Sequence, residues 1–371
     1  METSIQTNVE VDLKAIQANA KAIKARTGGQ LIAVVKADAY GHGAIAVTKE
    51  LHTIADMFAV ATVAEGIELR EAGIRKPILI LFSPLPDLAE EIVAYDLTPA
   101  IDNFTLALRL NKVLDDKHLQ LQLAGKKKVK VHVDVNTGMN RSGVRYTEAA
   151  AFLRKLKTLP NLEVEGIFTH FATAHQTDNS FAHLQLNRFS CVLANIPNIP
   201  MTHAANSAAA LAIPESHLDA VRPGLSLYGI YPANEKPIQL QPALMWKARV
   251  GWIDFIEQGE GVSYGLVYKA SSRTRVAGIQ VGFGDGYPRA LSGIGEVLID
   301  GKRRSIIGRI CMDMLVVQLE PSDNVAVGDE VVLIGKQGSE EITIYEVAAR
   351  ANTIPYRILT SIAKRVNRIY S

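Results

Sequence analysis

The sequence has few of the features that mark exported, membrane-spanning or nucleic-acid-binding proteins. Among its 371 residues only Cys191 and Cys311 are cysteines, too few for a disulfide framework. The 40 basic residues nearly balance the 38 acidic ones, and a net charge of +2 gives no electrostatic footprint for nucleic acid. The first residues lack the charged head and apolar middle of a signal peptide, and no apolar run reaches transmembrane length. These absences predict a cytoplasmic protein without a nucleic-acid or membrane partner.

Apolar residues make up 48% of the chain, and its length predicts two domains. Between residues 30 and 225, eight short apolar runs alternate with longer amphipathic segments. The runs are residues 31–35, 57–62, 77–81, 97–101, 129–135, 164–171, 201–206 and 218–225. The last two are weak as strands because they contain few β-branched residues. The intervening segments have helical periodicity, as in residues 147–159, where Phe152, Leu153 and Leu156 share one face.

This alternation predicts that residues 1–240 form an α/β domain, a parallel (β/α)8 barrel of the TIM type. A doubly wound open sheet is the alternative. After residue 240 apolar residues alternate, and Asp300-Gly301 separates two strand-like runs, which is typical of a tight hairpin. Residues 241–371 are therefore expected to form a mostly antiparallel β domain, with the proline-containing residues 231–242 as the linker.

Polar residues gather at the ends of the predicted barrel strands, where barrel enzymes carry their chemistry. They are Lys36, Asp134, Arg141, His170, Asn206, Ser207, Arg222 and Gly224. Each has an ordinary structural interpretation when taken alone, because a strand-end cation is usually solvated and a lone histidine is usually a satisfied structural group. One barrel mouth that holds all of them favours a functional site.

The loops after the seventh and eighth strands often form a phosphate site in such barrels. Here Ser207 begins a helical run, and Gly224 lets the backbone approach a phosphate closely. A phosphate site at one side of the mouth and a lysine at the other suggest pyridoxal phosphate, whose aldehyde forms a Schiff base with an amine. Lys36 is the candidate amine, and Tyr40 could reach back to the phosphate.

Eight segments, in order along nearly the whole chain, resemble bacterial alanine racemase. They are "AVVKADAYGHG", "NTGMNRSGV", "THFATA", "HAANSAAA", "VRPGLSLYG", "GEGVSYG", "GDGYPR" and "GRICMDM". The resemblance implies a barrel followed by a β domain, pyridoxal 5'-phosphate as cofactor and no metal. It also implies a head-to-tail homodimer in which the β domain of one subunit contributes to the partner's active site.

The resemblance implies a role for individual residues. Lys36 would carry the cofactor and act as one base, and Tyr264 would reach in from the partner subunit as the other. Arg141 would bind the substrate carboxylate, as would the backbone of Met312 from the partner subunit. The residues placed at the cofactor are Tyr40, His170, Asn206, Ser207, Arg222, Gly224, Leu225 and Tyr356, of which Arg222 would face the pyridine nitrogen and His170 would orient the network between Tyr264 and Arg222. Supporting positions are Asp134, Asp313, Arg289 and Arg309, the last two at the channel by which substrate enters.

These residue types suit the interconversion of L-alanine and D-alanine, which supplies D-alanine for peptidoglycan. Two bases on opposite faces can remove and return a proton directly, provided that the site lowers the pKa of a tyrosine near 10 or tolerates little anion. Arginine stays protonated and would leave the ring nitrogen unprotonated, which weakens the electron sink and suppresses transamination. For Tyr264 the structural alternative is a hairpin aromatic packed on the sheet.

Two positions depart from the family pattern. Many alanine racemases have a carbamylated lysine seven residues before the substrate-binding arginine, and here that position is Asp134, followed by Asn136. We expect Asp134 to supply the anion without modification and to need a water or a shifted Arg141 for contact. Phe283 stands where family members usually have tyrosine, within a glycine-rich turn at residues 282–289.

Three other functions compete with this interpretation. A basic-amino-acid decarboxylase of the same architecture pairs the ring nitrogen with a carboxylate, which Arg222 disfavours. A single-barrel pyridoxal-phosphate carrier would lack the β domain. A broad-specificity racemase acting on serine or lysine resembles this family closely but is typically exported, and Tyr356 is expected to crowd the pocket and favour a methyl side chain.

Overall fold

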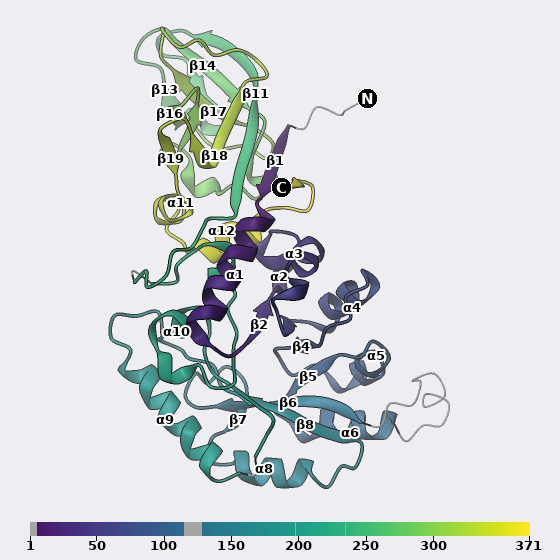
Figure 1. Cartoon of the computed structure of the whole chain (residues 1–371). Helices are drawn as coiled ribbons and strands as arrows, with labels where there is room; N and C mark the ends of the chain where they lie inside the picture. Colours follow the sequence, from purple (N-terminus) through teal and green to yellow (C-terminus); the bar gives the residue numbers. More distant parts are fainter. Residues whose placement is uncertain (1–5, 115–127, 197, 234) are drawn as a thin grey trace. The chain divides into compact units, whose positions relative to one another are not determined.

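The structure is a computed structural model that describes residues 6–114, 128–196, 198–233 and 235–371. These residues fall into two compact units. The barrel unit contains the described residues of 14–39 and 44–242, and the sheet unit contains residues 6–13, 40–43 and 243–371. Each unit is described separately below (Figure 1).

Eight parallel strands form a closed ring in the barrel unit. They are β2 (Gln30–Val34), β3 (Met57–Val60), β4 (Ile78–Ile80), β5 (Thr98–Ile101), β6 (Val129–Asn136), β8 (Leu162–Phe168), β9 (Met201–His203) and β10 (Ala220–Val221). Their order is β5-β4-β3-β2-β10-β9-β8-β6, and pairing of β5 with β6 closes the ring. The barrel prediction is confirmed for all eight apolar runs, and the open sheet is wrong. A short β7 (Val144–Arg145) pairs with β6 outside the ring.

The two runs that were weak in sequence form short strands in the ring, and only β4, with three residues, is comparably short. β9 has three residues and β10 has two, and a single Cα pair, Ala220 with His203, joins them. The short strands leave the following backbone free to form loops at this side of the barrel. Those loops carry Asn206, Ser207 and Gly224.

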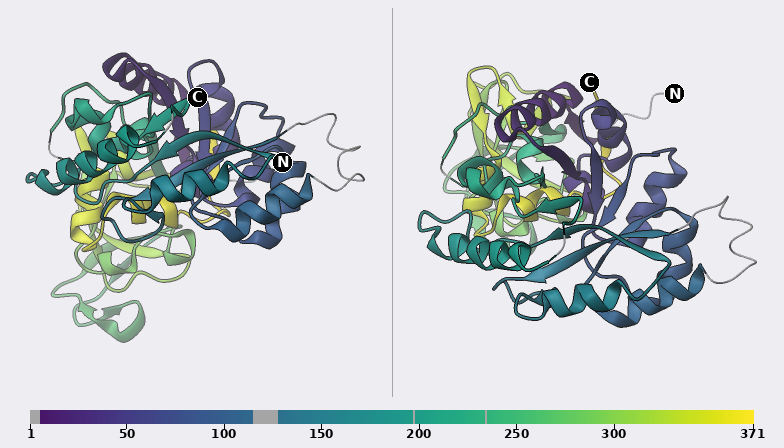
Figure 2. Two further views of the ribbon diagram at one scale, coloured as in Figure 1. Left: turned by 90° about the horizontal axis from the view of Figure 1, so that it is seen from below. Right: turned by 60° about the horizontal axis from the view of Figure 1, so that its bottom comes forward.

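Helices cover the outside of the barrel strands (Figures 1 and 2). They are α1 (Leu13–Thr27), α3 (Ala44–Glu50), α4 (Val63–Glu71), α5 (Ala89–Ala94), α6 (Phe104–Val113), α8 (Ala149–Leu156), α9 (Ser180–Ala194) and α10 (Ser207–Ala212). In α8, Leu153 and Leu156 are buried as their spacing predicts, while Phe152 is half-buried. Helix α4 begins with a capping box formed by Thr62 and Glu65.

The sheet unit is mostly antiparallel, as predicted. Its strands are β1 (Thr7–Val11), β11 (Leu244–Ile256), β14 (Thr274–Ile279), β15 (Glu296–Ile299), β16 (Lys302–Ile307), β17 (Leu315–Leu319), β18 (Glu330–Gln337), β19 (Glu340–Ile342) and β20 (Asn367–Tyr370). They follow the order β19-β18-β15-β16-β17-β14-β11-β1-β20. Strands β12 (Gly261–Val262) and β13 (Tyr268–Lys269) form a separate ribbon, and helices α11 (Ile344–Arg350) and α12 (Pro355–Ser361) follow β19.

The predicted Asp-Gly hairpin joins β15 to β16. Both turn residues have positive φ, 52° at Asp300 and 69° at Gly301, which matches the twist of the flanking strands. The N-terminal strand was not anticipated, because β1 pairs with β11 and β20 of the sheet unit although it precedes the barrel in sequence. Residues 40–43 also group with the sheet unit.

Candidate active site

Lys36 lies directly after β2, at the mouth of the barrel. Its neighbour Val35 donates a backbone hydrogen bond to Ala59 O, so the residue before the lysine is still held by the barrel ladder. Burial lowers the pKa of the Lys36 amine, the positive charges of Arg141 and Arg222 lower it as well, and Glu65 opposes them. More of the amine is therefore neutral at a given pH than in an exposed lysine, and the neutral amine can act as a nucleophile or a base.

The chain turns away from Lys36 through a left-handed segment, α2 (Lys36–Tyr40). Ala37, Asp38, Ala39 and Tyr40 all have φ between 52° and 54°, although none is glycine. A non-glycine residue in this conformation is strained by roughly 1–2 kcal/mol, and such strain persists only where the surroundings over-determine it. The sequence contained no signal for this turn.

Two carboxylates hold the turn in place. Glu65 accepts hydrogen bonds from Ala37 N at 2.7 Å and, with its other oxygen, from Ala61 N at 2.7 Å. The Asp38 carboxylate accepts from Ala44 N at 2.7 Å. Glu65 thus fixes the backbone beside Lys36 and places a negative charge near its amine, a role that sequence reasoning missed.

Phe82, in the loop after β4, joins Lys36 to Arg141. The Lys36 Nζ lies 5.6 Å from the centre of the Phe82 ring, and the Arg141 guanidinium carbon lies 4.9 Å from it. Both distances are in the range of cation–π contacts. The predicted cofactor lysine and carboxylate-binding arginine are therefore brought to one aromatic ring, which the sequence analysis did not single out.

Arg222 is buried inside the barrel and held by several acceptors. Its Nη2 donates to Thr169 O at 2.7 Å and to Ala204 O at 3.1 Å, and lies 3.4 Å from His170 Nδ1. Its Nη1 lies 2.6 Å from His203 Nδ1. Burial lowers the pKa of Arg222 to about 10, which still leaves it protonated at neutral pH. The predicted pairing of Arg222 with His170 is present, and His203 is an additional partner.

His170 is kept neutral by its surroundings. Burial lowers its pKa well below the ordinary value, and the charges of Arg222, Arg141 and Lys36 lower it further. Because guanidinium can only donate, His170 Nδ1 accepts from Arg222. The imidazole is therefore oriented by the arginine.

Asp134 does not contact Arg141 directly. It is only 6% exposed, and its Oδ2 accepts a hydrogen bond of 2.8 Å from Ser142 Oγ. No hydrogen bond joins it to Arg141 in the structure. Burial raises the pKa of Asp134 to about 6, so it is an anion above that pH. The expected anion is present, but the expected contact is replaced by Ser142, the residue next to Arg141.

A hydroxyl with one unused hydrogen lies where the sequence predicted a phosphate site. Ser207 Oγ accepts from Gly224 N at 2.9 Å and from Ser226 N at 3.3 Å, which leaves only its own hydrogen to donate. The hydroxyl of Ser226 is buried without a hydrogen-bond partner in the described part of the chain. Asn206 instead caps α10, accepting from Ala209 N, and Leu225 is buried. Two hydroxyls beside backbone N–H groups suit a phosphate.

In the sheet unit, Tyr40 and Tyr356 lie side by side. Their ring centres are 6.0 Å apart at an angle of 49°. Burial raises the pKa of Tyr356, so its hydroxyl stays protonated and able to donate. The structure therefore brings together the two tyrosines that were predicted to hold the phosphate.

Tyr264 projects from the sheet unit. Its side chain is 72% exposed, so the alternative in which it packs on the sheet is wrong. The preceding Ser263 has φ of 62° and bonds through Oγ to Arg309 O at 2.6 Å and to Cys311 Sγ at 3.1 Å. These contacts tie the Tyr264 loop to the segment that carries Met312. Cys311 and Cys191 are both free cysteines.

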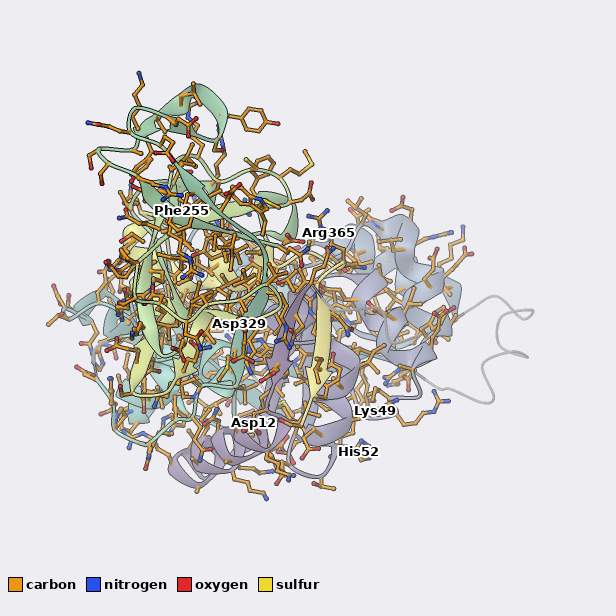
Figure 3. All side chains as sticks on the ribbon, turned by 90° about the horizontal axis from the view of Figure 1, so that it is seen from above. Asp12, Lys49, His52, Phe255, Asp329 and Arg365 are labelled. Carbon is orange, nitrogen blue, oxygen red and sulfur yellow. The ribbon has the colours of Figure 1, made fainter. Side chains whose placement is uncertain are left out.

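The glycine-rich turn at residues 282–289 holds the Met312 segment. Phe283 N donates to Cys311 O at 3.0 Å and Gly284 N to Met312 O at 2.8 Å. Arg365, labelled in Figure 3, bridges Asp285 and Asp313 with bonds of 2.7 Å each. The predicted turn is confirmed, and it also positions Met312 and Asp313.

Arg289 and Arg309 line one hollow of about 430 Å³ in the sheet unit, together with Ala290 and Ser292. A second hollow of about 670 Å³ beside it includes Phe283, Arg289 and Arg357. The first hollow brings together the two arginines that were expected at the substrate channel, and both hollows include Arg289. They lie in the unit that also exposes Tyr264 and Met312.

The described residues lack two kinds of feature. No helix in that part of the chain is long and apolar enough to cross a membrane. Over the same residues, no three or more histidine, cysteine, aspartate or glutamate side chains gather in a way that could hold a metal ion.

Comparisons with known proteins agree with this geometry. Residues 11–232 match the family described as alanine racemase, N-terminal domain, and residues 243–370 match alanine racemase, C-terminal domain. A curated alanine racemase of Carboxydothermus hydrogenoformans is 45% identical, and the match covers 97% of this chain and 98% of the relative.

Solved structures of alanine racemases are also similar to this chain over its whole length. The crystal structure of alanine racemase from E. faecalis has a TM-score of 0.92 at 34% identity and covers 100% of both chains. The alanine racemase of Bartonella henselae, with covalently bound pyridoxal phosphate, has a TM-score of 0.89 at 28% identity and 99% coverage of both. The chain therefore belongs to the alanine racemase family, whose enzymes are pyridoxal-phosphate-dependent isomerases that interconvert L-alanine and D-alanine.

Proposed function

We propose that the chain racemises alanine with Lys36 and Tyr264 as its two bases. The observation that carries this assignment is the arrangement at the barrel mouth, where the Lys36 amine and the Arg141 guanidinium both lie against one aromatic ring, that of Phe82. Lys36 has a lowered pKa and Arg141 is exposed to bind a carboxylate. A base and an anion-binding group at this spacing suit an amino acid substrate.

The residues present fit pyridoxal phosphate. The unused hydrogen of Ser207 and the unpartnered hydroxyl of Ser226 can donate to phosphate oxygens, with Gly224 and Leu225 in the same loop. Tyr40, Tyr356 and Asn206 complete the proposed cofactor set. The bonds of Arg222 use its Nη1 and Nη2, and its Nε has no hydrogen-bond partner in the described part of the chain. Arg222 would face the pyridine nitrogen, and Lys36 would hold the aldehyde.

When bound, pyridoxal phosphate accepts the electrons that remain at the α-carbon after its proton leaves. Lys36 Nζ takes or returns the proton on one face, and its lowered pKa keeps part of the amine neutral for this task. Arg222 stays protonated at neutral pH and can only donate a hydrogen bond, so it would leave the ring nitrogen unprotonated. Arg141 and the Met312 backbone hold the substrate carboxylate.

The second base comes from a partner subunit. The family is homodimeric, and Tyr264 of one subunit serves the barrel of the other, with His170 orienting the network between Tyr264 and Arg222. The high exposure of Tyr264 and its rigid attachment through Ser263 support this proposal. In this view residues 1–240 bind the cofactor, and residues 241–371 supply Tyr264, Met312 and Asp313, with Arg289 and Arg309 at the substrate channel.

We assign the activity to the cytoplasm and to the supply of D-alanine for peptidoglycan. Tyr356 is the residue proposed to restrict the pocket to a methyl side chain. A substrate panel tests this point. We expect kcat/KM to be highest for alanine, whereas equal values for serine or lysine would favour the broad-specificity alternative.

The assignment of Lys36 is tested by fixing the cofactor to the protein. Borohydride reduction of the holoenzyme makes its covalent attachment permanent, and peptide mass mapping should find the modification on Lys36. Lys36→Arg should lose it. Lys24→Arg, which keeps the charge paired with Asp56, should retain it. Modification of another lysine in the wild-type protein would overturn the assignment.

A further inference from the structure

A buried line of polar side chains runs from Arg222 through the barrel interior to Glu165. Arg222 Nη1 lies 2.6 Å from His203 Nδ1, and His203 Nε2 lies 2.8 Å from His132 Nδ1. His132 Nε2 then lies 3.6 Å from Glu165 Oε2. The side chains come from four barrel strands or strand ends: β10, β9, β6 and β8. Neither histidine is exposed.

The direction of every hydrogen in this line follows from Arg222. A guanidinium only donates, so His203 Nδ1 accepts. A neutral imidazole then has its hydrogen on Nε2, which donates to His132 Nδ1. His132 must in turn hold its hydrogen on Nε2, which faces Glu165. Burial lowers the pKa of both histidines, and the Arg222 charge lowers it further, while Glu165 opposes the shift at His132 without reversing it, so both are neutral at neutral pH.

The last contact joins two atoms that have no other partner. His132 Nε2 and Glu165 Oε2 are both buried, and neither has a hydrogen bond elsewhere in the described part of the chain. The other carboxylate oxygen of Glu165 accepts from Lys130 Nζ at 2.5 Å, which holds the side chain in position. The contact with His132 lowers the pKa of Glu165 to about 2, with Lys130 contributing, so Glu165 is an anion.

The strand geometry provides room for this arrangement. Gly166 lies next to Glu165, and a Cβ there would stand 2.5 Å from ring atoms of His132. The pairing of β6 with β8 also shifts its register between Val131 and His132. A glycine and a register shift at one point allow the His132 ring to approach the neighbouring strand closely.

The line of side chains helps to compensate the positive charge of the buried Arg222. Arg222 is 3% exposed, and no carboxylate is hydrogen-bonded to it among the described residues, although the charge of Asp134 acts on it through space. A buried charge that is poorly compensated is strongly unfavourable. Hydrogen bonds in a chain polarise one another, and the negative charge of Glu165, 3.6 Å from His132 Nε2, adds to this polarisation, so His203 Nδ1 becomes a better acceptor for Arg222.

We propose that Glu165 and His132 are positioning residues for Arg222: His132 accepts the Nε2 hydrogen of His203, which keeps His203 Nδ1 turned toward the guanidinium, and Glu165 extends the line to a carboxylate. The proposal rests on the proposed function only for its effect on the reaction. The arrangement of hydrogens itself is a property of the folded barrel. Lys130, Glu165 and Arg222 are the charged groups along this line.

The first test reads the histidines directly. Nitrogen-15 NMR of histidine-labelled protein, with and without pyridoxal phosphate, should show His132 and His203 as neutral rings with hydrogen on Nε2. Glu165→Gln should change the His132 signals and, through them, those of His203. The matched control is Glu163→Gln, because Glu163 is an exposed glutamate on the same strand. Wild-type signals with hydrogen on Nδ1, or a charged ring, would overturn the proposal even if no variant folds.

The second test separates positioning from general structure. In Glu165→Gln we expect kcat for alanine to fall about tenfold, as for outer partners of functional histidines, with little change in KM. The absorbance of the bound cofactor should also change its pH dependence, and Glu165→Asp should restore part of kcat. Equal behaviour of Glu165→Gln and Glu163→Gln would refute the proposal. A wild-type protein that does not racemise alanine but shows the expected hydrogens would refute the function alone.

Discussion

A lysine amine is useful as a base only after it has lost its proton, and three features around Lys36 favour that loss. The side chain is half-buried, and Arg141 and Arg222 place positive charge near it. Glu65 partly offsets them. Burial lowers the pKa of His170, and the same two arginines lower it further. Individual protonation states at this barrel mouth therefore depend on the arginines, which hold their own charge.

Asp134 gives a prediction about stability. Burial raises its pKa to about 6 from an ordinary 3.8, so between these values the folded chain binds a proton that the unfolded chain has lost. Stability therefore falls as pH rises through this window. Asp134→Asn removes the charge and should raise the free energy of unfolding above pH 6 by up to about 3 kcal/mol, since each unit corresponds to about 1.4 kcal/mol.

The measurement is urea unfolding at several values of pH. The gain from Asp134→Asn should grow from pH 4 to pH 6 and then stay level. Asp87→Asn, at an exposed position, is the control and should show no such dependence. A gain that is the same at pH 4 and pH 8 would contradict the raised pKa.

A second prediction concerns the role of the same carboxylate in activity. Asp134 is already an anion above about pH 6 and is linked to the Arg141 region through Ser142. Racemisation should therefore not depend on bicarbonate. Asp134→Ala should mainly raise KM for alanine, because Arg141 loses the nearby charge that orients it. A bicarbonate requirement, or unchanged KM in Asp134→Ala, would show that Asp134 is not the anion.

Among the elements, the strained turn after β2 depends most on a side chain from elsewhere. Glu65 caps α4 and also accepts from Ala37 N in the left-handed segment. Glu65→Ala leaves the N–H groups of Ala37 and Ala61 without their acceptor. The change should lower the free energy of unfolding by about 1–2 kcal/mol, as loss of a helix cap does. It should also lower kcat, because the backbone beside Lys36 is no longer held.

Glu68→Ala is the matched control, since Glu68 is an exposed glutamate on the same helix. Thermal unfolding and alanine kinetics of both variants would be compared. Equal stability and kcat in the two variants would show that the turn holds itself without Glu65.

For the whole molecule, the prediction is that activity requires two chains. Lys36→Ala and Tyr264→Phe should each be nearly inactive as homodimers, because each removes one base from both sites. Mixed dimers should regain activity, since one of their two sites combines Lys36 of the Tyr264→Phe chain with Tyr264 of the Lys36→Ala chain. The measurement is alanine racemisation after subunit exchange, with each variant exchanged against itself as control. Confirmed exchange without return of activity would contradict shared sites.

Local patterns in the sequence were sufficient for much of this architecture. Eight apolar runs predicted the barrel strands, and Asp300-Gly301 predicted the β15–β16 hairpin, because both depend on side-chain periodicity and on backbone preferences of neighbouring residues. The order of polar residues at strand ends also predicted that Lys36 and Arg141 share one mouth. These inferences required no knowledge of which distant residues touch.

Contacts between distant residues were decided only by the tertiary structure. The sequence did not indicate that Asp134 bonds to Ser142 rather than Arg141, or that Phe82 lies beside Lys36. It gave no sign of the left-handed turn after Lys36, since alanine and aspartate rarely adopt that conformation without support from outside the segment. Nor did it indicate that β1 belongs to the C-terminal sheet. Periodicity records which face of an element is buried, whereas the partner on that face is chosen by the packing of the whole chain.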